Sequence, residues 1–254
     1  MKIMGQTERQ NKVSIILPNF NSAEYILSTI KSINNQSYKN WELIIVDDCS
    51  NIKTKKLLNR FNEKKKIKIF LLKKNKGAAY CRNLAIKKSK SKYLAFIDSD
   101  DTWEKNKLKI QLKYMEENNL DFTYTNYKTF GLKKKKVKPP FKFNFNTFTK
   151  NTSIATSTMI VTRKVAQGVK FTDTPICEDY FFKCKILKKI KYAYCIKTYL
   201  TSYRIRKNSM QSNMIKNFLW IWKINYKYNR FNFFQNLNSL FFISLNSIKK
   251  YGIK

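Results

Sequence analysis

The chain has 254 residues, of which 52 are Lys or Arg and 16 are Asp or Glu, with no His and a formal charge of +36. Without imidazole, Ser-His-Asp triads, Cys-His pairs and His-ligated zinc are excluded, so acid–base chemistry must use carboxylates, Lys, Tyr or Cys, and a metal must bind oxygen ligands. The five cysteines form no C-x-x-C pair, which argues against a disulfide framework or a thiolate metal site and favours a reducing compartment.

The large positive charge would suit nucleic acid or an anionic membrane. However, 45 of the 52 basic residues are Lys, and the chain has 27 Asn but only 5 Gly and 4 Pro. A general compositional bias explains this skew better than a dedicated nucleic-acid face. Residues 1–12 lack the apolar run of a signal peptide, and no 18-residue apolar stretch occurs in the chain. We therefore expect a cytoplasmic protein, or one peripheral on the inner face of the cell membrane.

Short, largely apolar runs alternate with helical patterns in the first half of the chain. The runs lie at 13–17, 41–46, 67–72 and 93–97. Strands of this kind are covered on both faces, so the pattern predicts an α/β fold with a mostly parallel sheet and helices on each side. In such sheets a ligand binds beyond the carboxyl ends of the strands.

The second half is less regular. It has patterns typical of a helix at 103–118, a strand near 121–127, a surface loop at 131–140, a strand at 157–162, a helix from Glu178 to about 189, and extended segments at 192–196 and 198–206. Residues 213–254 alternate aromatic residues and Lys at helical spacing, and no acidic residue follows Asp179. We expect this last segment to be a helical extension.

The scarce acidic residues mark candidate sites. Seven of the 16 lie in three short clusters: Asp47-Asp48, Asp98-Ser99-Asp100-Asp101 and Glu178-Asp179. The first two clusters directly follow predicted strands, where the ligand edge of the sheet is expected. If the segment is extended, the carboxylates of Asp98 and Asp100 point the same way and suit Mg²⁺ or Mn²⁺. Asp101, with Glu104 three residues later, instead resembles the capping box of the predicted helix at 103–118.

Each of the other candidates has two interpretations. Asp47-Asp48 either bonds ribose hydroxyls or a base N–H, or caps a helix near 52–62. Glu178-Asp179 either supplies a general base or simply favours a helix start through the macrodipole. Arg82 lies near the start of a predicted helix after Gly77, an arrangement that can bind an anion. The basic run at 203–209 is either a concentrated positive site or more of the solvated surface.

Taken together, these segments resemble the family 2 glycosyltransferases with the GT-A fold, of the kind that builds bacterial cell-surface glycans. The resemblance covers roughly residues 12–212. It rests on VSIILPNFN at 13–21, WELIIVDDCS at 41–50, NKGAAYCRNLAI at 75–86, YLAFIDSDD at 93–101, STMIVTRKV at 157–165, Glu178-Asp179 and YRIRKNSMQS at 203–212. It implies a Rossmann-like sheet and inverting transfer of a sugar from a nucleotide-sugar, commonly UDP- or GDP-linked, to an acceptor hydroxyl.

The resemblance also implies roles for individual positions. Asp179 would be the catalytic base. The donor-binding residues would be Pro18 and Asn21 in the nucleotide loop, Asp48 at the base, Arg82 near the diphosphate and Asp98 at the ribose. Asp98 and Asp100 would hold Mg²⁺ or Mn²⁺. The Q-x-x-R-W element of processive members is absent, so we expect single additions to a growing cell-surface glycan or a lipid-linked oligosaccharide.

The predicted organisation follows from these assignments. It consists of an N-terminal arm (1–12), a catalytic domain (13–212) with a nucleotide-binding half (13–101) and an acceptor-binding half (102–212), and a basic, aromatic extension (213–254). The extension either lies on an anionic membrane or packs as a flap on the catalytic domain. Two other functions compete with sugar transfer: a basic nucleic-acid-binding protein, and a degenerate domain that binds nucleotide-sugar without turnover.

Overall fold

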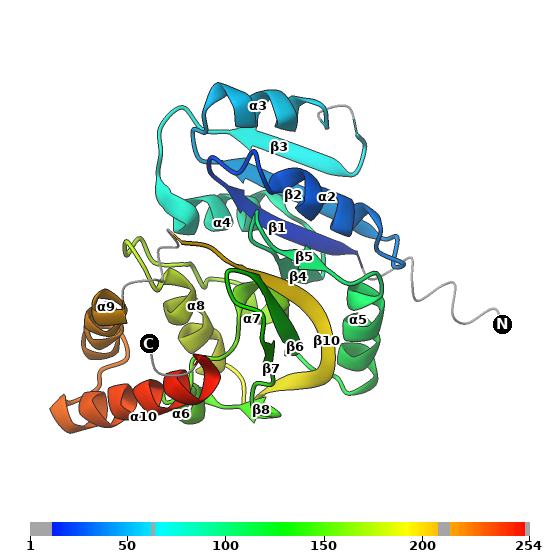
Figure 1. Cartoon of the computed structure of the whole chain (residues 1–254). Helices are drawn as coiled ribbons and strands as arrows, with labels where there is room; N and C mark the ends of the chain where they lie inside the picture. Colours follow the sequence, from blue (N-terminus) through cyan, green and yellow to red (C-terminus); the bar gives the residue numbers. More distant parts are fainter. Residues whose placement is uncertain (1–11, 62–63, 208–213, 252–254) are drawn as a thin grey trace.

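The structure, a computed structural model, describes residues 12–61, 64–207 and 214–251, so the predicted arm at 1–12 lies almost entirely outside the described residues. One mixed sheet runs through the molecule in the order β3-β2-β1-β4-β9-β6-β10-β5 (Figure 1). Its first four strands are mutually parallel: β1 (Val13–Asn19), β2 (Trp41–Asp47), β3 (Ile67–Leu71) and β4 (Tyr93–Phe96). These strands confirm the parallel half predicted from the apolar runs.

The other half of the sheet reverses direction. Strand β9 (Ile160–Thr162) runs antiparallel between β4 and β6 (Phe122–Gly131), and β10 (Ala193–Ile205) is parallel to β6. The short strands β5 (Thr102–Trp103), β7 (Lys136–Val137) and β8 (Lys142–Phe143) pair at the margins. The two extended segments expected at 192–206 are one strand, because register shifts between Ile196 and Thr201 interrupt its pattern without ending it.

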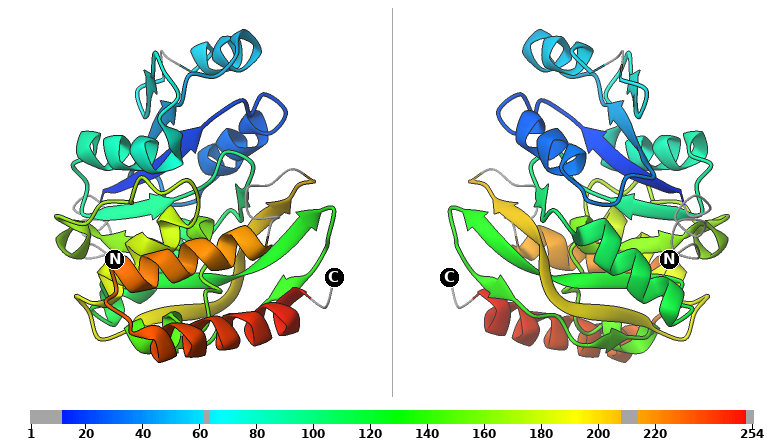
Figure 2. Two further views of the ribbon diagram at one scale, coloured as in Figure 1. Left: turned by 90° about the vertical axis from the view of Figure 1, so that its left-hand side faces the viewer. Right: turned by 90° about the vertical axis from the view of Figure 1, so that its right-hand side faces the viewer.

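Helices cover both faces of the sheet, as predicted (Figures 1 and 2). On one face, α2 (Ile26–Asn34), α3 (Ile52–Asn59) and α5 (Lys107–Glu117) share a buried core with the odd-numbered positions of β1. On the other face, α4 (Gly77–Lys88) and α8 (Glu178–Leu187) share a second core with Ile16 and Phe96. The extension forms two helices, α9 (Met214–Lys227) and α10 (Phe233–Tyr251). No helix in the described part of the chain is both long and apolar enough to cross a membrane.

Two predicted boundaries in the second half are wrong. The helix expected from 103 begins at Lys107, because Thr102 and Trp103 instead pair with β10 as strand β5. The indole of Trp103 holds this strand in place by donating to the carbonyl oxygen of Ser157 at 2.8 Å. The strand expected at 157–162 starts late, since Thr156–Thr158 form a 3₁₀ turn. Both differences place polar residues close to the end of β4.

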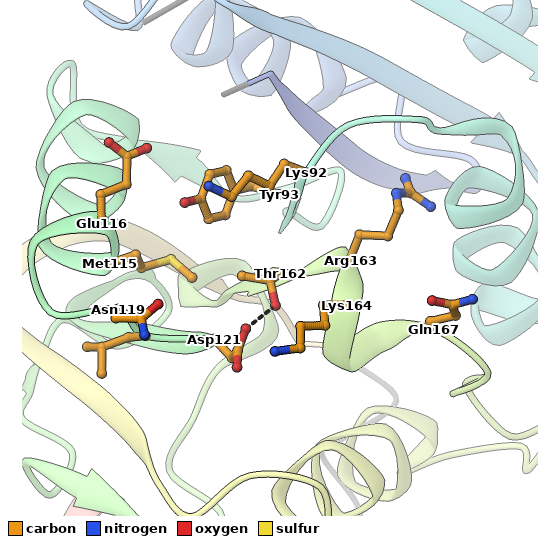
Figure 3. Close-up of a pocket in the computed structure, with 11 residues that line it drawn as sticks. Lys92, Tyr93, Met115, Glu116, Asn119, Asp121, Thr162, Arg163, Lys164 and Gln167 are labelled. Atoms are coloured by element: carbon orange, nitrogen blue, oxygen red, sulfur yellow. Dashed lines mark hydrogen bonds between the residues drawn. The ribbon is translucent and has the colours of Figure 1, made fainter. Parts of the chain in front are cut away.

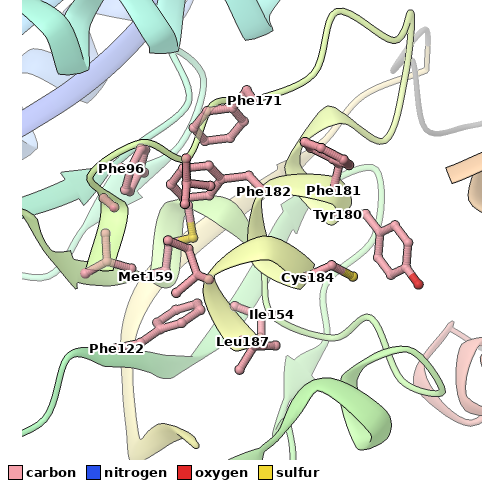
Figure 4. Close-up of a cluster of buried hydrophobic side chains, with 14 of the residues drawn as sticks. Phe96, Phe122, Ile154, Met159, Phe171, Tyr180, Phe181, Phe182, Cys184 and Leu187 are labelled. Carbon is pink, nitrogen blue, oxygen red and sulfur yellow. The ribbon is translucent and has the colours of Figure 1, made fainter. Parts of the chain in front are cut away.

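An aromatic cluster fixes α8 against the sheet (Figure 4). The rings of Phe171 and Phe182 are stacked with centroids 4.0 Å apart and an interplanar angle of 5°. Phe96, the last residue of β4, contacts both rings with centroids 5.7 Å away. Asp98 lies two residues after Phe96, and Glu178 begins α8, so this cluster helps to set the distance between two of the acidic clusters.

Replacing Phe182 with Ala should therefore be costly. The side chain is fully buried, and loss of a buried phenyl ring from a core lowers the free energy of unfolding by about 3–5 kcal/mol. Urea denaturation of the purified variant measures this change. The matched control is Phe234→Ala on α10, where the ring is 78% exposed and the change should stay within about 0.5 kcal/mol. Equal losses for the two variants would contradict the packing described here.

Candidate functional site

The acidic residues after β4 form a tight turn. The backbone N–H of Asp101 donates to the carbonyl oxygen of Asp98 at 3.1 Å, and the N–H of Asp98 donates to the Ser157 hydroxyl at 3.0 Å. The expectation that an extended segment aligns Asp98 and Asp100 is therefore wrong, because the chain turns between them. The two carboxylates still lie close together: burial first, and then the negative charge of Asp98, raise the pKa of Asp100.

Asp101 does not cap a helix. Its side chain is fully buried, and its carboxylate accepts hydrogen bonds from the Ser157 hydroxyl and from the backbone N–H of Arg204. The helix it was expected to cap begins six residues later, after Asn106. Burial and the charges of Asp100 and Asp98 raise the pKa of Asp101 well above its ordinary value. Its role is to tie the acidic turn to β10.

Arg82 joins two of the predicted clusters. Its Nη2 donates to Asp98 at 2.7 Å and its Nη1 donates to Glu178 at 2.6 Å, while the guanidinium lies over the ring of Phe171. Burial would lower the pKa of Arg82, but the charges of Asp98 and Glu178 outweigh burial and raise it. Only 5% of the residue is exposed, so Arg82 holds the carboxylates in place in this structure rather than facing solvent as an open anion site.

Asp179 lies beside this group, in the first turn of α8. Its Oδ2 accepts from Lys183 Nζ at 2.6 Å and from the Thr156 hydroxyl at 2.9 Å. Burial raises the pKa of Asp179, but the charge of Lys183 outweighs it and lowers the pKa to about 2. Glu178 differs, because burial raises its pKa against the opposing effect of Arg82. The residue before them, Cys177, has a left-handed backbone with φ of 63°, which orients the helix start.

The predicted nucleotide loop follows β1 and β2. Asn21 has φ of 47° and its side chain accepts from the N–H of Asn51, which caps α3 with its own side chain. The interpretation of Asp47-Asp48 as the cap of that helix is therefore wrong. Asp48 instead accepts from the backbone N–H groups of Lys76 and Gly77, at 2.6 and 2.8 Å. Pro18 is buried within β1, so it fixes the start of the loop.

The end of β10 supplies two arginines to the acidic turn. Arg206 Nε is 2.7 Å from Asp100 Oδ2, and Arg204 Nε donates to the carbonyl oxygen of Asp100 at 3.0 Å. The ring of Tyr25 lies 4.6 Å from the Arg204 guanidinium and 5.4 Å from that of Arg206. Arg204 and Arg206 of the basic run at 203–209 therefore contact the acidic turn and are not simply solvated surface. Residues 208–209 of the run lie outside the described part of the chain.

Several residues of this site were missed from the sequence. They are Tyr25, Thr156, Ser157 and Lys183. Of these, only Lys183 carried a signal, because it lies four residues after Asp179 and so on the same side of a helix. The others reach the site through tertiary contacts that connect distant parts of the chain.

A cavity of about 720 Å³ lies elsewhere, at the amino ends of β4 and β6 (Figure 3). Its lining includes Tyr93, Asp121 and Arg163. Asp121 already accepts a hydrogen bond from Thr162, and Arg163 is bonded to Ser89 and to the carbonyl oxygen of Ser91. Since ligands of parallel sheets bind at the carboxyl ends of the strands, this cavity is separate from the candidate site.

Comparison with known proteins shows which family the chain resembles. The model of the family "Glycosyl transferase family 2" matches residues 14–170. The chain is 32% identical to the putative teichuronic acid biosynthesis glycosyltransferase TuaG of Bacillus subtilis, over 94% of this chain and 96% of that protein. It is 34% identical to the UDP-Glc:alpha-D-GlcNAc-diphosphoundecaprenol beta-1,3-glucosyltransferase WfgD of Escherichia coli, over 84% of each chain.

A solved structure shares the fold. It is that of S. aureus TarS residues 1–349 in complex with UDP-GlcNAc, with a TM-score of 0.74 and 20% sequence identity, over 93% of this chain and 75% of that one. At this identity the likeness concerns the path of the backbone. It supports the order and direction of the strands in the sheet.

The Lys183–Asp179 pair gives a prediction on pH. In the wild type, the lowered pKa of Asp179 stabilises the fold above the ordinary Asp pKa, and this contribution is lost as pH falls from about 4 to about 2. Lys183→Met leaves a buried carboxylate unpaired, so the free energy of unfolding at pH 7 should fall by about 3–5 kcal/mol. The deficit should shrink with acidification as Asp179 takes up a proton.

Chemical denaturation across pH 3–8 measures both effects, and carbon NMR titration of Asp179 reports its pKa directly. Lys183→Arg, which keeps the positive charge, is the matched control and should preserve the low pKa. If the Asp179 pKa stayed at about 2 in Lys183→Met, then Lys183 would not be its cause.

Proposed function

The chain belongs to glycosyl transferase family 2, and from this we propose that it moves a sugar from a nucleotide diphosphate-sugar, UDP-linked or similar, to an acceptor hydroxyl with inversion. The observation that carries the proposal is Arg82, which gathers Asp98 and Glu178 from two distant elements at the carboxyl edge of the sheet. A protein that only binds polyanions through its basic surface does not require such an arrangement. The relatives named for teichuronic acid and for a diphosphoundecaprenol acceptor support a growing cell-surface glycan or lipid-linked oligosaccharide as acceptor.

The donor nucleotide is assigned to the loops after β1 and β2. Asp48 is buried and each of its carboxylate oxygens accepts one backbone N–H, from Lys76 or Gly77. A carboxylate oxygen has a second lone pair, so Asp48 can also accept from the N–H of a base. Asn21 and Pro18 shape the neighbouring loop, where the nucleotide would lie. Asp98, with 29% of its side chain exposed, is available to the ribose.

The acidic turn fits a divalent metal. Asp98 and Asp100 are hard oxygen donors, and the pKa of Asp100 is raised by burial and by its like-charged neighbour, a conflict that a cation relieves. No group of three potential ligands was found among the described residues, so waters and donor phosphates would complete the coordination. When bound, Mg²⁺ or Mn²⁺ would neutralise the charge that develops on the departing diphosphate.

The chain's own side chains supply the remaining chemistry. Asp179 is ionised across the physiological range, which is the protonation state that a general base needs to take the proton of the acceptor hydroxyl as that oxygen attacks the sugar. Its pKa of about 2 makes it a weak base while it is paired with Lys183. Lys183 and Thr156 hold one of its oxygens and thereby orient the carboxylate. Arg204 and Arg206 contribute positive charge next to the acidic turn, where the leaving diphosphate would gather negative charge. We place this reaction at the cytoplasmic face of the membrane, with the enzyme attached peripherally.

The first test concerns the base. Asp179→Asn should lower the turnover number for sugar transfer by about 10²–10⁴-fold, because the amide cannot accept the proton, while binding of UDP stays unchanged. The matched control is Asp173→Asn, an exposed acid six residues earlier, which should keep full activity. Turnover is followed as UDP release from UDP-sugars with lipid-linked acceptors. Full activity of Asp179→Asn would refute its role as the base. Wild-type protein that binds UDP but produces no free UDP from any UDP-sugar would indicate a degenerate domain.

The second test concerns the metal. Asp100→Asn should weaken Mn²⁺ binding in the presence of UDP by at least about tenfold, because a ligand is lost. Arg206 competes for the same carboxylate oxygen, so Arg206→Gln should tighten binding of Mn²⁺ alone by up to about fivefold. Calorimetric titration measures both, and Arg60→Gln, on an exposed residue beyond α3, is the control. Equal Mn²⁺ affinity for the wild type and Asp100→Asn would exclude this metal site.

A further inference from the structure

The helices α9 and α10 are fixed to the catalytic domain by polar contacts as well as by apolar packing. The hydroxyl of Tyr180 donates to the side chain of Asn225 at 2.7 Å, and Asn225 donates to Ser239 at 3.1 Å. Ser239 in turn donates to the carbonyl oxygen of Thr149 at 2.6 Å. All four residues are buried. The inner side of the two helices is therefore a specific, hydrogen-bonded interface.

The opposite side of α10 is apolar and exposed. Its residues recur at intervals of three and four, which places them on one side of the helix. They are Phe234, Leu237, Phe241, Leu245 and Ile248. An ordinary surface helix has the reverse arrangement, with its apolar side buried. In a chain where 52 of 254 residues are basic, the stretch 233–248 also contains no charged residue at all. The compositional bias that explains the other lysines therefore does not explain α10.

Helix α9 continues this surface and adds charge to it. Ile215, Leu219 and Tyr226 are exposed on one side of the helix. Lys216, Lys223 and Lys227 are exposed on the adjacent side, as their helical spacing requires. The rings of Trp222 and Phe233 lie 5.6 Å apart and those of Phe233 and Phe234 lie 5.8 Å apart, so aromatic contacts connect the two helices. We call the exposed apolar residues of α9 and α10 the outer face.

The charge around the outer face indicates which kind of partner it can bind. Residues 214–251, which form the two helices and their connection, contain six basic residues and no acid, so a second copy of this chain would bring like charge against like charge. Nucleic acid would satisfy the lysines but leave the phenylalanine and leucine side chains in water. An anionic bilayer satisfies both, because apolar side chains enter the acyl boundary while lysines contact the phosphate groups.

We propose that the outer face of α9 and α10 binds the surface of an anionic lipid bilayer. Figure 1 shows both helices at the end of the molecule opposite α3, and Figure 2 shows them side by side along one flank. Attachment here leaves the carboxyl edge of the sheet uncovered and holds it near the membrane. The proposal depends on the proposed function only for the lipid-linked nature of the acceptor, because the outer face can bind lipid whether or not the enzyme turns over.

Vesicle sedimentation of the full chain tests the proposal. Wild-type protein should bind vesicles of phosphatidylcholine with about 30% phosphatidylglycerol at least about tenfold more tightly than vesicles of phosphatidylcholine alone. The triple variant Phe234→Gln, Leu237→Gln, Phe241→Gln should lose at least about tenfold in affinity for the anionic vesicles. The triple variant Lys216→Gln, Lys223→Gln, Lys227→Gln should lose about ten- to a hundredfold and only on anionic vesicles.

The matched control is Ile52→Gln, on an exposed isoleucine at the start of α3, which should bind vesicles like the wild type. Circular dichroism and thermal unfolding confirm that each variant is folded. The proposal is overturned if the wild-type protein does not bind anionic vesicles, or if the triple variant at Phe234, Leu237 and Phe241 binds them as tightly as the wild type. So does a dimer detected by light scattering that this variant abolishes, if lipid does not dissociate the dimer. UDP release from UDP-sugar in solution, without vesicles, is measured in parallel. If the wild-type protein released no UDP, that result would count against the proposed function alone.

Discussion

The buried guanidinium of Arg82 is the interaction on which the candidate site depends. It comes from α4, yet it bonds Asp98 at the end of β4 and Glu178 at the start of α8, which are 80 residues apart in the chain. Each of the three charges would be costly to bury alone, so the group is stable only when it is complete. Because Asp179 follows Glu178 directly, the same contact also sets where the proposed base lies relative to the acidic turn.

Neutral side chains complete this arrangement. Ser157 accepts from the N–H of Asp98, donates to the buried Asp101, and its carbonyl oxygen accepts from the indole of Trp103. One serine thus connects the turn, the strand β5 and the 3₁₀ turn before β9. Lys183 likewise positions the carboxylate of Asp179, to which it donates a hydrogen bond. The carboxylates of the candidate site are thus positioned by residues that have no proposed role in the reaction, as is expected when a site must be rigid before its substrate arrives.

The sequence was informative wherever a residue's role depended on local pattern. Apolar runs located the parallel strands, and the rarity of acids in a lysine-rich chain singled out Asp98, Asp100 and Asp179. Asp101 was assigned wrongly because its spacing to Glu104 suits a cap equally well, and only the pairing of β5 with β10 removes the helix start. Ser157 and Thr156 had no local signal. Local pattern does not distinguish a flap from a membrane-bound extension. In the structure the inner side of α9 and α10 packs on the catalytic domain, and the outer face is exposed.

The hydrogen bonds beneath α9 and α10 have a geometric consequence. A purely apolar interface would allow the helices to shift along each other. The hydrogen bonds that run from Tyr180 through Asn225 and Ser239 to Thr149 can all form in only one register. Tyr180 is also the neighbour of Asp179, so the helix that carries the proposed base is anchored directly to the pair of helices. If the outer face rests on a bilayer as proposed, the two helices would hold Asp179 at a fixed distance from the lipid surface, and that distance would determine which hydroxyl of a lipid-linked acceptor reaches the carboxylate.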